Sequence, residues 1–322
     1  MGRPVLQPAQ SQAMTDITAT HPAPVGRRRK LRPVSRNPLT LTLLTAPALI
    51  WFIAFMVGPL MALFYFSTLD WPGLLAPSSF TGLENFSRMF SDPLIQRAAV
   101  NTALQVGVVV PIMLLISFML GYYLSLMPRG HRIIRVALFT PVLLSTSAQA
   151  MVFSGVFSQM GLINATLRSI GLRQFAQPWL ANGESAIVCI MIVGIWSAVS
   201  LSTLMFATRL ASISPEVFEA AELDGCGHWS KMWRIAAPIC KDFAGVVTML
   251  QFLWVLFGSA TLVLLLTRGG PGNSTVTMAF LVYDLSFNRN MVGYGQALAV
   301  LLFFIGVLGM VGIRMAFRPR GG

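Results

Sequence analysis

Residues Glu219–Ile239 read EAAELDGCGHWSKMWRIAAPI, and this stretch decides how the chain is organised. It carries three acidic and two basic side chains and is interrupted by glycine. The chain around it is very apolar: 55% of its residues are hydrophobic, 11% are charged, and the mean hydropathy is +0.70. A soluble domain has about 25% charged residues. The stretch is therefore a polar insert between apolar segments of a membrane protein.

Six apolar blocks, each free of Asp, Glu, Lys and Arg, are long enough to cross a bilayer, which needs about 20 apolar residues. They are Leu39–Leu69, Ala98–Pro128, Val136–Leu167, Ser185–Thr208, Phe243–Thr267 and Met291–Ile313. Lipid offers the backbone no hydrogen-bond partners, so continuous blocks predict helices. A β-barrel would need short alternating segments instead. We predict an all-α, polytopic membrane protein with six transmembrane helices.

The net charge of +12 raises the possibility of a nucleic-acid partner, but the distribution of charge argues against it. With a cytoplasmic N-terminus, seventeen of the 23 Lys and Arg residues fall on the inner side of the membrane. This asymmetry is the positive-inside bias of membrane proteins. It predicts that both termini and the polar insert are cytoplasmic. The expected partner of the positively charged segments is the lipid bilayer, and no nucleic-acid partner is expected.

Composition divides the chain into a tail and one domain. Residues 1–37 are rich in Pro, Ala, Thr and Arg and show no periodic apolar face, so we predict a disordered, basic cytoplasmic tail. Residues 38–320 form the predicted six-helix domain, and the insert occupies its 212–241 loop. The three histidines are scattered without metal-ligand spacing, so no metal site is expected.

The insert itself reads as two short helices joined by a glycine turn. Ser214 and Pro215 are typical of a helix start, and Gly225 is placed to end that helix. A second helix is expected near Trp229 to Ala236, ending before Pro238. The residues allow two interpretations: an amphipathic pair resting on the membrane surface, or a docking element for a groove on a partner protein.

The spacing of the insert resembles the EAA loop of permease subunits of binding-protein-dependent ABC importers. The shared pattern is Glu219-Ala220-Ala221, three residues, Gly225, nine residues, Ile235, one residue, then Ala237-Pro238. The departures are Ala237, where the family usually has Leu, and Cys226, where Ala is frequent. Further segments resemble the carbohydrate-uptake (MalF/UgpA-like) type of this family: FTGLENF at 80–86, Asn101-Thr102, Gly161-Leu162-Ile163-Asn164, and Thr267 with Gly269-Gly270-Pro271 and Thr275.

The resemblance implies an inner-membrane subunit of a prokaryote that works with three partners: a second homologous permease, an ATPase dimer and an extracytoplasmic solute-binding protein. It also implies that the loop docks the ATPase through Glu219, Ala220, Ala221, Asp224, Gly225, Ile235 and Pro238. The chain has only three lysines and none follows a glycine, so it lacks a P-loop. We therefore expect a non-catalytic subunit without bound cofactor, with ATP and Mg on the partner.

The predicted spans contain no carboxylate, Lys, Arg or His, whereas ion-coupled carriers usually bury such groups. This absence argues against a secondary transporter, and a self-contained secondary transporter of a neutral solute is kept as the alternative function. Amide and aromatic side chains suit the hydroxyls and ring faces of a sugar, and the candidate path residues are Gln251, Trp254, Gln149 and Trp196. Neutral polar residues in spans also simply bond neighbouring helices, which is the competing interpretation for each.

Overall fold

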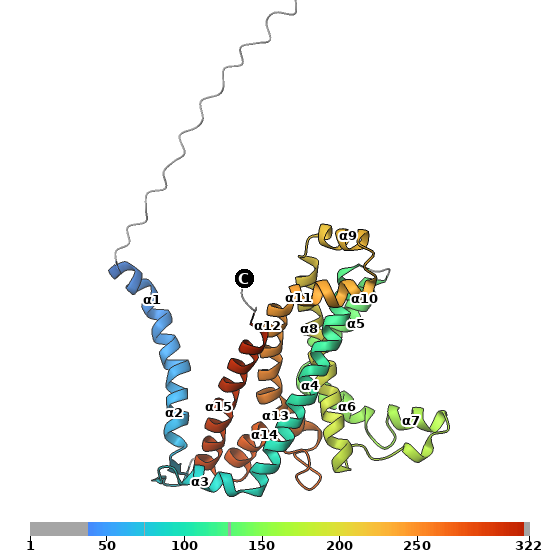
Figure 1. Cartoon of the computed structure of the whole chain (residues 1–322). Coiled ribbons are helices and arrows are strands. Elements are labelled where there is room, and N and C mark those ends of the chain that lie inside the picture. The colour runs from blue at the N-terminus through green and yellow to red at the C-terminus, as the bar shows by residue number, and fades with distance from the viewer. Residues whose placement is uncertain (1–37, 74, 128–129, 319–322) are drawn as a thin grey trace, which may run out of the picture. The chain divides into compact units, whose positions relative to one another are not determined.

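The computed structural model describes residues 38–73, 75–127 and 130–318 (Figure 1). The predicted tail, residues 1–37, lies outside this range. The chain divides into two compact units, residues 1–56 and 57–322. The first contains helix α1 (Pro38–Phe52), which continues into a π-helical turn, η1 (Ile53–Val57). Within it the rings of Trp51 and Phe55 lie 4.2 Å apart, centroid to centroid.

The second unit is built almost entirely from helices. Its elements in chain order are α2 (Gly58–Phe66), β1 (Leu69–Asp70), β2 (Ser79–Phe80), α3 (Glu84–Ser91), α4 (Pro93–Ser125), α5 (His131–Leu143), α6 (Thr146–Val156), α7 (Leu162–Ser169), η2 (Arg173–Phe175), α8 (Gly183–Ala211), α9 (Pro215–Leu223), α10 (His228–Ser230), η3 (Lys231–Ala236), α11 (Ala237–Ile239), α12 (Lys241–Leu253), η4 (Trp254–Gly258), α13 (Ser259–Leu266), α14 (Met278–Tyr283), η5 (Asp284–Asn288) and α15 (Val292–Phe317). The two short strands pair antiparallel, with Leu69 opposite Phe80.

Within the described residues, five helices are long and apolar enough to cross a membrane. They are Thr42–Phe66, Pro93–Ser125, Gly183–Ala211, Lys241–Leu266 and Val292–Phe317. A sixth span is obtained if the bent pair α5 and α6 counts as one crossing. The all-α, multi-span class predicted from the apolar blocks is confirmed.

The third block, Val136–Leu167, is not the continuous span that we predicted. Helices α5 and α6 meet at an angle of 105°. The break is local: Leu144 is extended, and the Ser145 hydroxyl accepts a hydrogen bond from the next helix as its N-cap. The buried side chain of Gln149 donates to the carbonyls of Pro141 (2.9 Å) and Leu144 (3.1 Å), and the Pro141 carbonyl also accepts from the amide of Leu144 (3.3 Å), so the backbone acceptors at the bend are satisfied.

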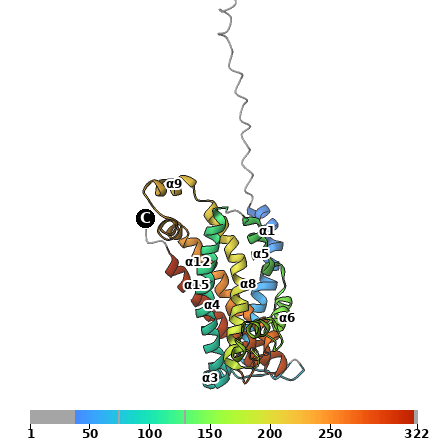
Figure 2. The same cartoon turned by 90° about the vertical axis from the view of Figure 1, so that its right-hand side faces the viewer.

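Helices α4 and α8 make the most extensive contact in the second unit and lie side by side in Figures 1 and 2. Their backbones approach closely at Gly121, where an added Cβ would lie 2.6 Å from the Cβ of Phe206. Lipid is as apolar as a leucine side chain, so helix association in a membrane depends on such close packing by small residues.

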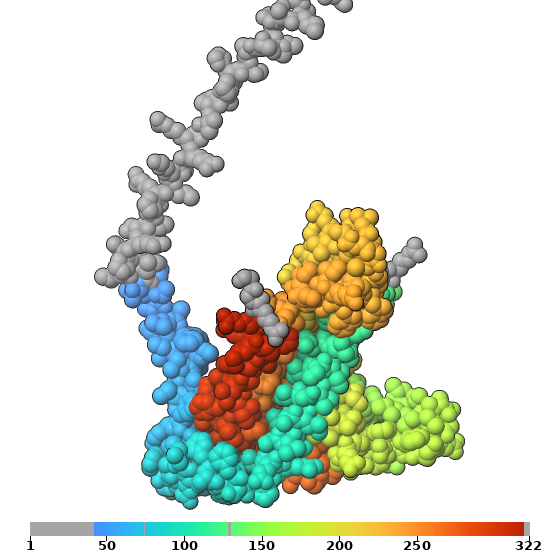
Figure 3. All heavy atoms as spheres, in the orientation of Figure 1, coloured from blue at the N-terminus to red at the C-terminus, as the bar shows by residue number. Residues whose placement is uncertain are grey.

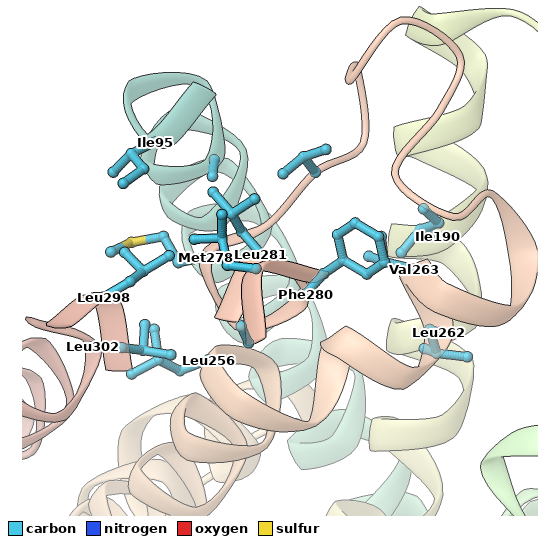
Figure 4. Packing of buried hydrophobic residues seen from close by; sticks show 14 of the residues in the cluster. Ile95, Ile190, Leu256, Leu262, Val263, Met278, Phe280, Leu281, Leu298 and Leu302 are labelled. Carbon is cyan, nitrogen blue, oxygen red and sulfur yellow. The ribbon is translucent and has the colours of Figure 1, made fainter. Parts of the chain in front are cut away.

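A second region of dense packing lies where α13, α14 and α15 meet α4 and α8 (Figure 4). Val263 and Leu281 are fully buried at its centre, and Leu298 of α15 packs with them. This cluster fixes the end of the spans that lies opposite the 212–241 loop (Figure 1).

Candidate functional site

The 212–241 loop stands beyond the ends of α8 and α12 (Figures 1 and 3). Helix α9 ends where the sequence predicts, because Gly225 adopts a left-handed conformation with φ +76°. The amide of Cys226 donates to the carbonyl of Ala221, and that of Gly225 to the carbonyl of Glu222, both at 2.9 Å. These two bonds form a Schellman turn, the usual way to satisfy the last carbonyls of a helix.

The second half of the loop is longer than predicted. A helical path runs from His228 through the π-helical segment Lys231–Ala236 to Ile239, so the expected end before Pro238 is wrong. Pro238 lies in α11, which follows the π-helical segment without a break. The helix therefore passes the proline and ends at Cys240.

Aromatic contacts fix this loop to the spans. The ring of Tyr122, near the end of α4, lies 6.4 Å from that of Phe218 and 5.1 Å from that of His228. One tyrosine thus contacts both halves of the loop. Beside it, Met232 and Ala236 are buried against the ends of α4 and α8. The loop consequently has a packed base, and its position depends on the positions of the two spans.

An ion pair joins the two halves directly. The Lys231 ammonium donates to the carboxylate of Glu222 across the glycine turn. The Lys231 side chain is 13% exposed, whereas that of Glu222 is 65% exposed. The hydrogen bond from Lys231 and its positive charge lower the pKa of Glu222 below its ordinary value.

Most of the residues predicted to dock a partner lie on the outer surface of the loop. Glu219, Ala220, Asp224, Gly225 and Pro238 are exposed, Ile235 is half-buried, and Ala221 is buried beneath the turn. Leu223 was missed by the sequence reasoning. Its side chain is 90% exposed between two acidic residues, and that placement of an apolar residue beside the glycine turn was the available signal.

The candidate path residues lie at two different places. Gln251 of α12 is buried, and its amide donates to the hydroxyl of Ser202 on α8 at 2.9 Å. Trp254, one turn further, is half-buried beside Gly194 of α8. This pair lies at the contact of the fourth and fifth apolar blocks.

Gln149 lies in the bend between α5 and α6, and its carbonyl oxygen has no hydrogen-bond partner among the described residues. Trp196 of α8 is half-buried and packs edge-on against Phe153, with ring centroids 5.1 Å apart. The structure therefore assigns Gln149 and Gln251 bonds that hold helices, in addition to any role toward a solute.

At the opposite end of the spans, two of the quoted sequence motifs meet. The buried amide of Asn101 donates to the carbonyls of Ser274 (2.8 Å) and Val276 (2.9 Å). The hydroxyl of Thr102 accepts from the amide of Met278 at 3.0 Å. The segment that follows the Gly-Gly-Pro turn is thus fixed to the start of the second apolar block.

Asn164 organises a lobe at the same end, around α7. Its side chain is fully buried and donates to the carbonyls of Ser158, Gln159 and Gln177. Its carbonyl oxygen accepts from the indole of Trp179 at 2.9 Å. A single amide therefore closes the segment between α6 and α8.

Comparison with known proteins identifies the family. Residues 113–320 match the profile of the "Binding-protein-dependent transport system inner membrane component". The chain is 27% identical over 293 residues to the probable ABC transporter permease protein YurN of Bacillus subtilis (strain 168), covering 89% of this chain and 99% of that one. It is 30% identical over 269 residues to the sulfoquinovosyl glycerol transport system permease protein SmoG of Agrobacterium fabrum, covering 82% of this chain and 86% of that protein.

The fold agrees with this assignment. A bacterial alginate ABC transporter, crystallised in complex with an alginate pentasaccharide-bound periplasmic protein, contains a chain that superposes with a TM-score of 0.77. The match covers 87% of this chain and 94% of the other at 18% identity. The chain belongs to the family of binding-protein-dependent transport system inner membrane components, the permease subunits of ABC transporters.

Proposed function

We propose that the chain forms half of the translocation path of an importer that is driven by ATP hydrolysis on separate subunits. The observation that carries this proposal is the 212–241 loop. It exposes Glu219 and Ala220 on its outer surface while its base is packed on α4 and α8. A partner that moves the loop would therefore move two spans with it. The remaining subunits would be a second permease and an extracytoplasmic solute-binding protein.

The proposed solute is a carbohydrate or a related polar compound. Relatives with this architecture include a diacetylchitobiose uptake permease of Streptomyces coelicolor and a lactose transport permease of Rhizobium radiobacter. The neutral spans of this chain are consistent with such a solute, because hydroxyl groups need hydrogen-bonding partners rather than ion pairs. The same neutrality disfavours an ion-coupled carrier.

Gln251 and Trp254 are the proposed solute-facing pair, because they lie on the helix that begins directly after the loop. Movement of the loop would alter the bond from Gln251 to Ser202 and expose the amide to the path. Gln251→Ala should reduce both transport and solute-stimulated ATP hydrolysis. If neither rate changed while the protein folded normally, the pair would not belong to the path.

The first experiment tests docking. The full chain is co-expressed with the products of its gene neighbours, purified in mild detergent and assayed for a co-purifying ATPase. Glu219→Lys should release the ATPase, because it replaces an exposed carboxylate at the centre of the loop with a cation. Glu84→Lys makes the same charge change on α3, at the opposite end of the spans, and should retain the ATPase.

Retention of the ATPase by wild type and by Glu84→Lys, with loss from Glu219→Lys, would support coupling through the loop. Absence of any ATPase from the wild-type preparation would favour a surface helix pair and a self-contained transporter. Equal release by both variants would indicate a nonspecific effect of charge.

The orientation of the chain in the membrane can be tested separately, because the cysteines of the loop differ in their exposure to a thiol reagent. Cys226 is half-buried at the glycine turn, whereas Cys240 is buried at the base of the loop, and burial raises the pKa of its thiol. A membrane-impermeant thiol reagent should label Cys226 only after the cytoplasmic face is opened. Labelling of intact cells at Cys226 would reverse the proposed topology. Cys226→Ser identifies the labelled site.

A further inference from the structure

A groove of about 780 Å³ lies between the start of α12 and the end of α15. Figures 1 and 2 show these two helix ends next to each other, at the same end of the spans as the 212–241 loop. The two helices touch closely at Gly245, where an added Cβ would lie 2.7 Å from the Cβ of Phe317. Gly245 and Phe317 both line the groove.

The groove has a charged rim. Arg314 of α15 and Arg318, the residue that follows the last turn of α15, line it, and both are exposed. Because both side chains border the same groove, the two guanidinium groups are placed to share one ligand. Neither arginine lies within 4.0 Å of a carboxylate of any residue that the structure describes. Asp242 also lines the rim, but it is in the first turn of α12, where the helix dipole stabilises its charge.

Below the rim the walls are apolar. Val246 and Met249 contribute from α12, and Val311 and Met315 from α15. The same face of α15 continues away from the rim with Leu308, which is 70% exposed. Cationic side chains at a membrane surface above an exposed apolar track match the two parts of a phospholipid, its phosphate and its acyl chain.

We propose that this groove binds an anionic phospholipid, with the phosphate held by Arg314 and Arg318 and an acyl chain along Val311 and Leu308. Arginine suits this role because its planar fork donates two hydrogen bonds to phosphate oxygens. The site is separate from the docking surface of the loop and does not depend on which solute is carried. Bound lipid would join the helix that follows the loop to the last span.

The test uses the purified full chain in detergent, titrated with dioleoyl phosphatidylglycerol or dioleoyl phosphatidylcholine, with retained lipid counted by native mass spectrometry. Wild type should retain phosphatidylglycerol preferentially. The double variant Arg314→Gln/Arg318→Gln should lose about 30-fold in affinity for it, about fivefold for each arginine. The matched control is Arg132→Gln/Arg135→Gln, which removes two exposed arginines of α5 at the same end of the spans and should retain the preference.

Two further measurements distinguish binding of a phospholipid from binding of a free anion. Dihexanoyl phosphatidylglycerol, which has the same headgroup on short chains, should bind far more weakly than the dioleoyl lipid. Inorganic phosphate at millimolar concentration should not displace the dioleoyl lipid. The proposal would be overturned if wild type retained both dioleoyl lipids equally, or if the two double variants lost affinity for phosphatidylglycerol equally. Displacement of the dioleoyl lipid by phosphate alone would also overturn it.

Discussion

Two of the polar segments that separate the apolar blocks, the 212–241 loop and the 267–278 segment, differ in how their polar residues are used. In the 212–241 loop the motif residues Glu219 and Asp224 are exposed, and neither carboxylate forms a side-chain hydrogen bond with a residue that the structure describes. At the opposite end, Asn101 and Thr275 are buried and hydrogen-bonded within the chain. Buried polar groups that are satisfied internally maintain a fold. Exposed motif residues on a rigid base are available to a partner.

The two segments therefore differ in role although both carry patterns that resemble the same family. The loop exposes most of its motif residues, whereas Thr275 of the other segment is buried and hydrogen-bonded. Substitutions in the 267–278 segment should therefore affect stability, whereas substitutions in the loop should leave the protein folded and affect association. The variants below test this division.

The largest effect is expected from Asn101→Ala. The substitution leaves the carbonyls of Ser274 and Val276 without their donor, at a cost of about 1–3 kcal/mol for each buried group. The melting temperature in detergent should fall by several degrees. Gln174→Ala, which removes an exposed amide within η2, is the control and should melt like wild type. If Asn101→Ala melted at the same temperature as wild type, the contacts of the 267–278 segment would not stabilise the fold.

A smaller and different effect is expected at Gly225. No atom outside its immediate neighbours lies within 4 Å of an added Cβ, so the constraint is the positive φ and not space. A left-handed conformation costs a β-branched residue about 1–2 kcal/mol. Gly225→Val should distort the turn and weaken ATPase association about tenfold, with little change in the melting temperature of the spans. Co-purification and melting are measured together.

Gly225→Asn is the matched control, because asparagine tolerates a positive φ better than other non-glycine residues. It should retain most of the ATPase. If valine and asparagine released the ATPase equally, the requirement at this position would be for the absence of a side chain at the interface, not for the turn.

The next effect in size concerns Leu223. The Leu223 side chain is 90% exposed on the proposed docking surface, so a partner that covers it would bind more tightly. Leu223→Ala should leave the melting temperature unchanged and weaken ATPase binding about fivefold, which corresponds to about 1 kcal/mol. Leu162→Ala removes a comparably exposed leucine at the opposite end and should leave binding unchanged. Unchanged binding for Leu223→Ala would exclude this side chain from the contact.

Much of the fold, and the separation of the spans from the 212–241 loop, could be predicted from the sequence, because both depend on local patterns. Long apolar blocks predict spans, and Gly225 after an acidic helix predicts the turn. The bend in the third block was not predicted. It depends on Gln149 reaching back to Pro141 and Leu144, and an amide in an apolar block carries no sign of which carbonyls it will meet. Pro141 and the serine cap at Ser145 were the local signals, within an otherwise apolar run.

For the 212–241 loop, too, local patterns could be predicted from the sequence and long-range contacts could not. The spacing of Glu219, Ala220 and Gly225 predicts a surface loop, and the structure exposes these residues. The contact of Tyr122 with both halves of the loop could not be predicted, because Tyr122 is about 100 positions earlier and resembles any aromatic residue at the end of a span. Long-range packing of this kind has no periodicity to reveal it.

The smallest effect should come from the ion pair between Lys231 and Glu222. Because the folded protein lowers the pKa of Glu222, the pair stabilises the loop at neutral pH and down through the ordinary range of a glutamate. Its contribution is lost only as the pH falls through the lowered pKa. Hydrogen exchange of residues 222–231, corrected for intrinsic rates, should therefore be slower in wild type than in Glu222→Gln at pH 7.

The same comparison at a pH below the ordinary range of a glutamate should show a smaller difference between the two proteins, because increasing protonation of Glu222 makes wild type resemble the variant. Using the variant as the reference removes the contributions of other carboxylates that titrate in the same range. Rates that differ equally at both pH values would mean that glutamine disturbs the turn by its shape. Rates that agree at both would mean that the aromatic contacts of Tyr122 alone hold the two halves together, and the ion pair is then an incidental feature of an exposed surface.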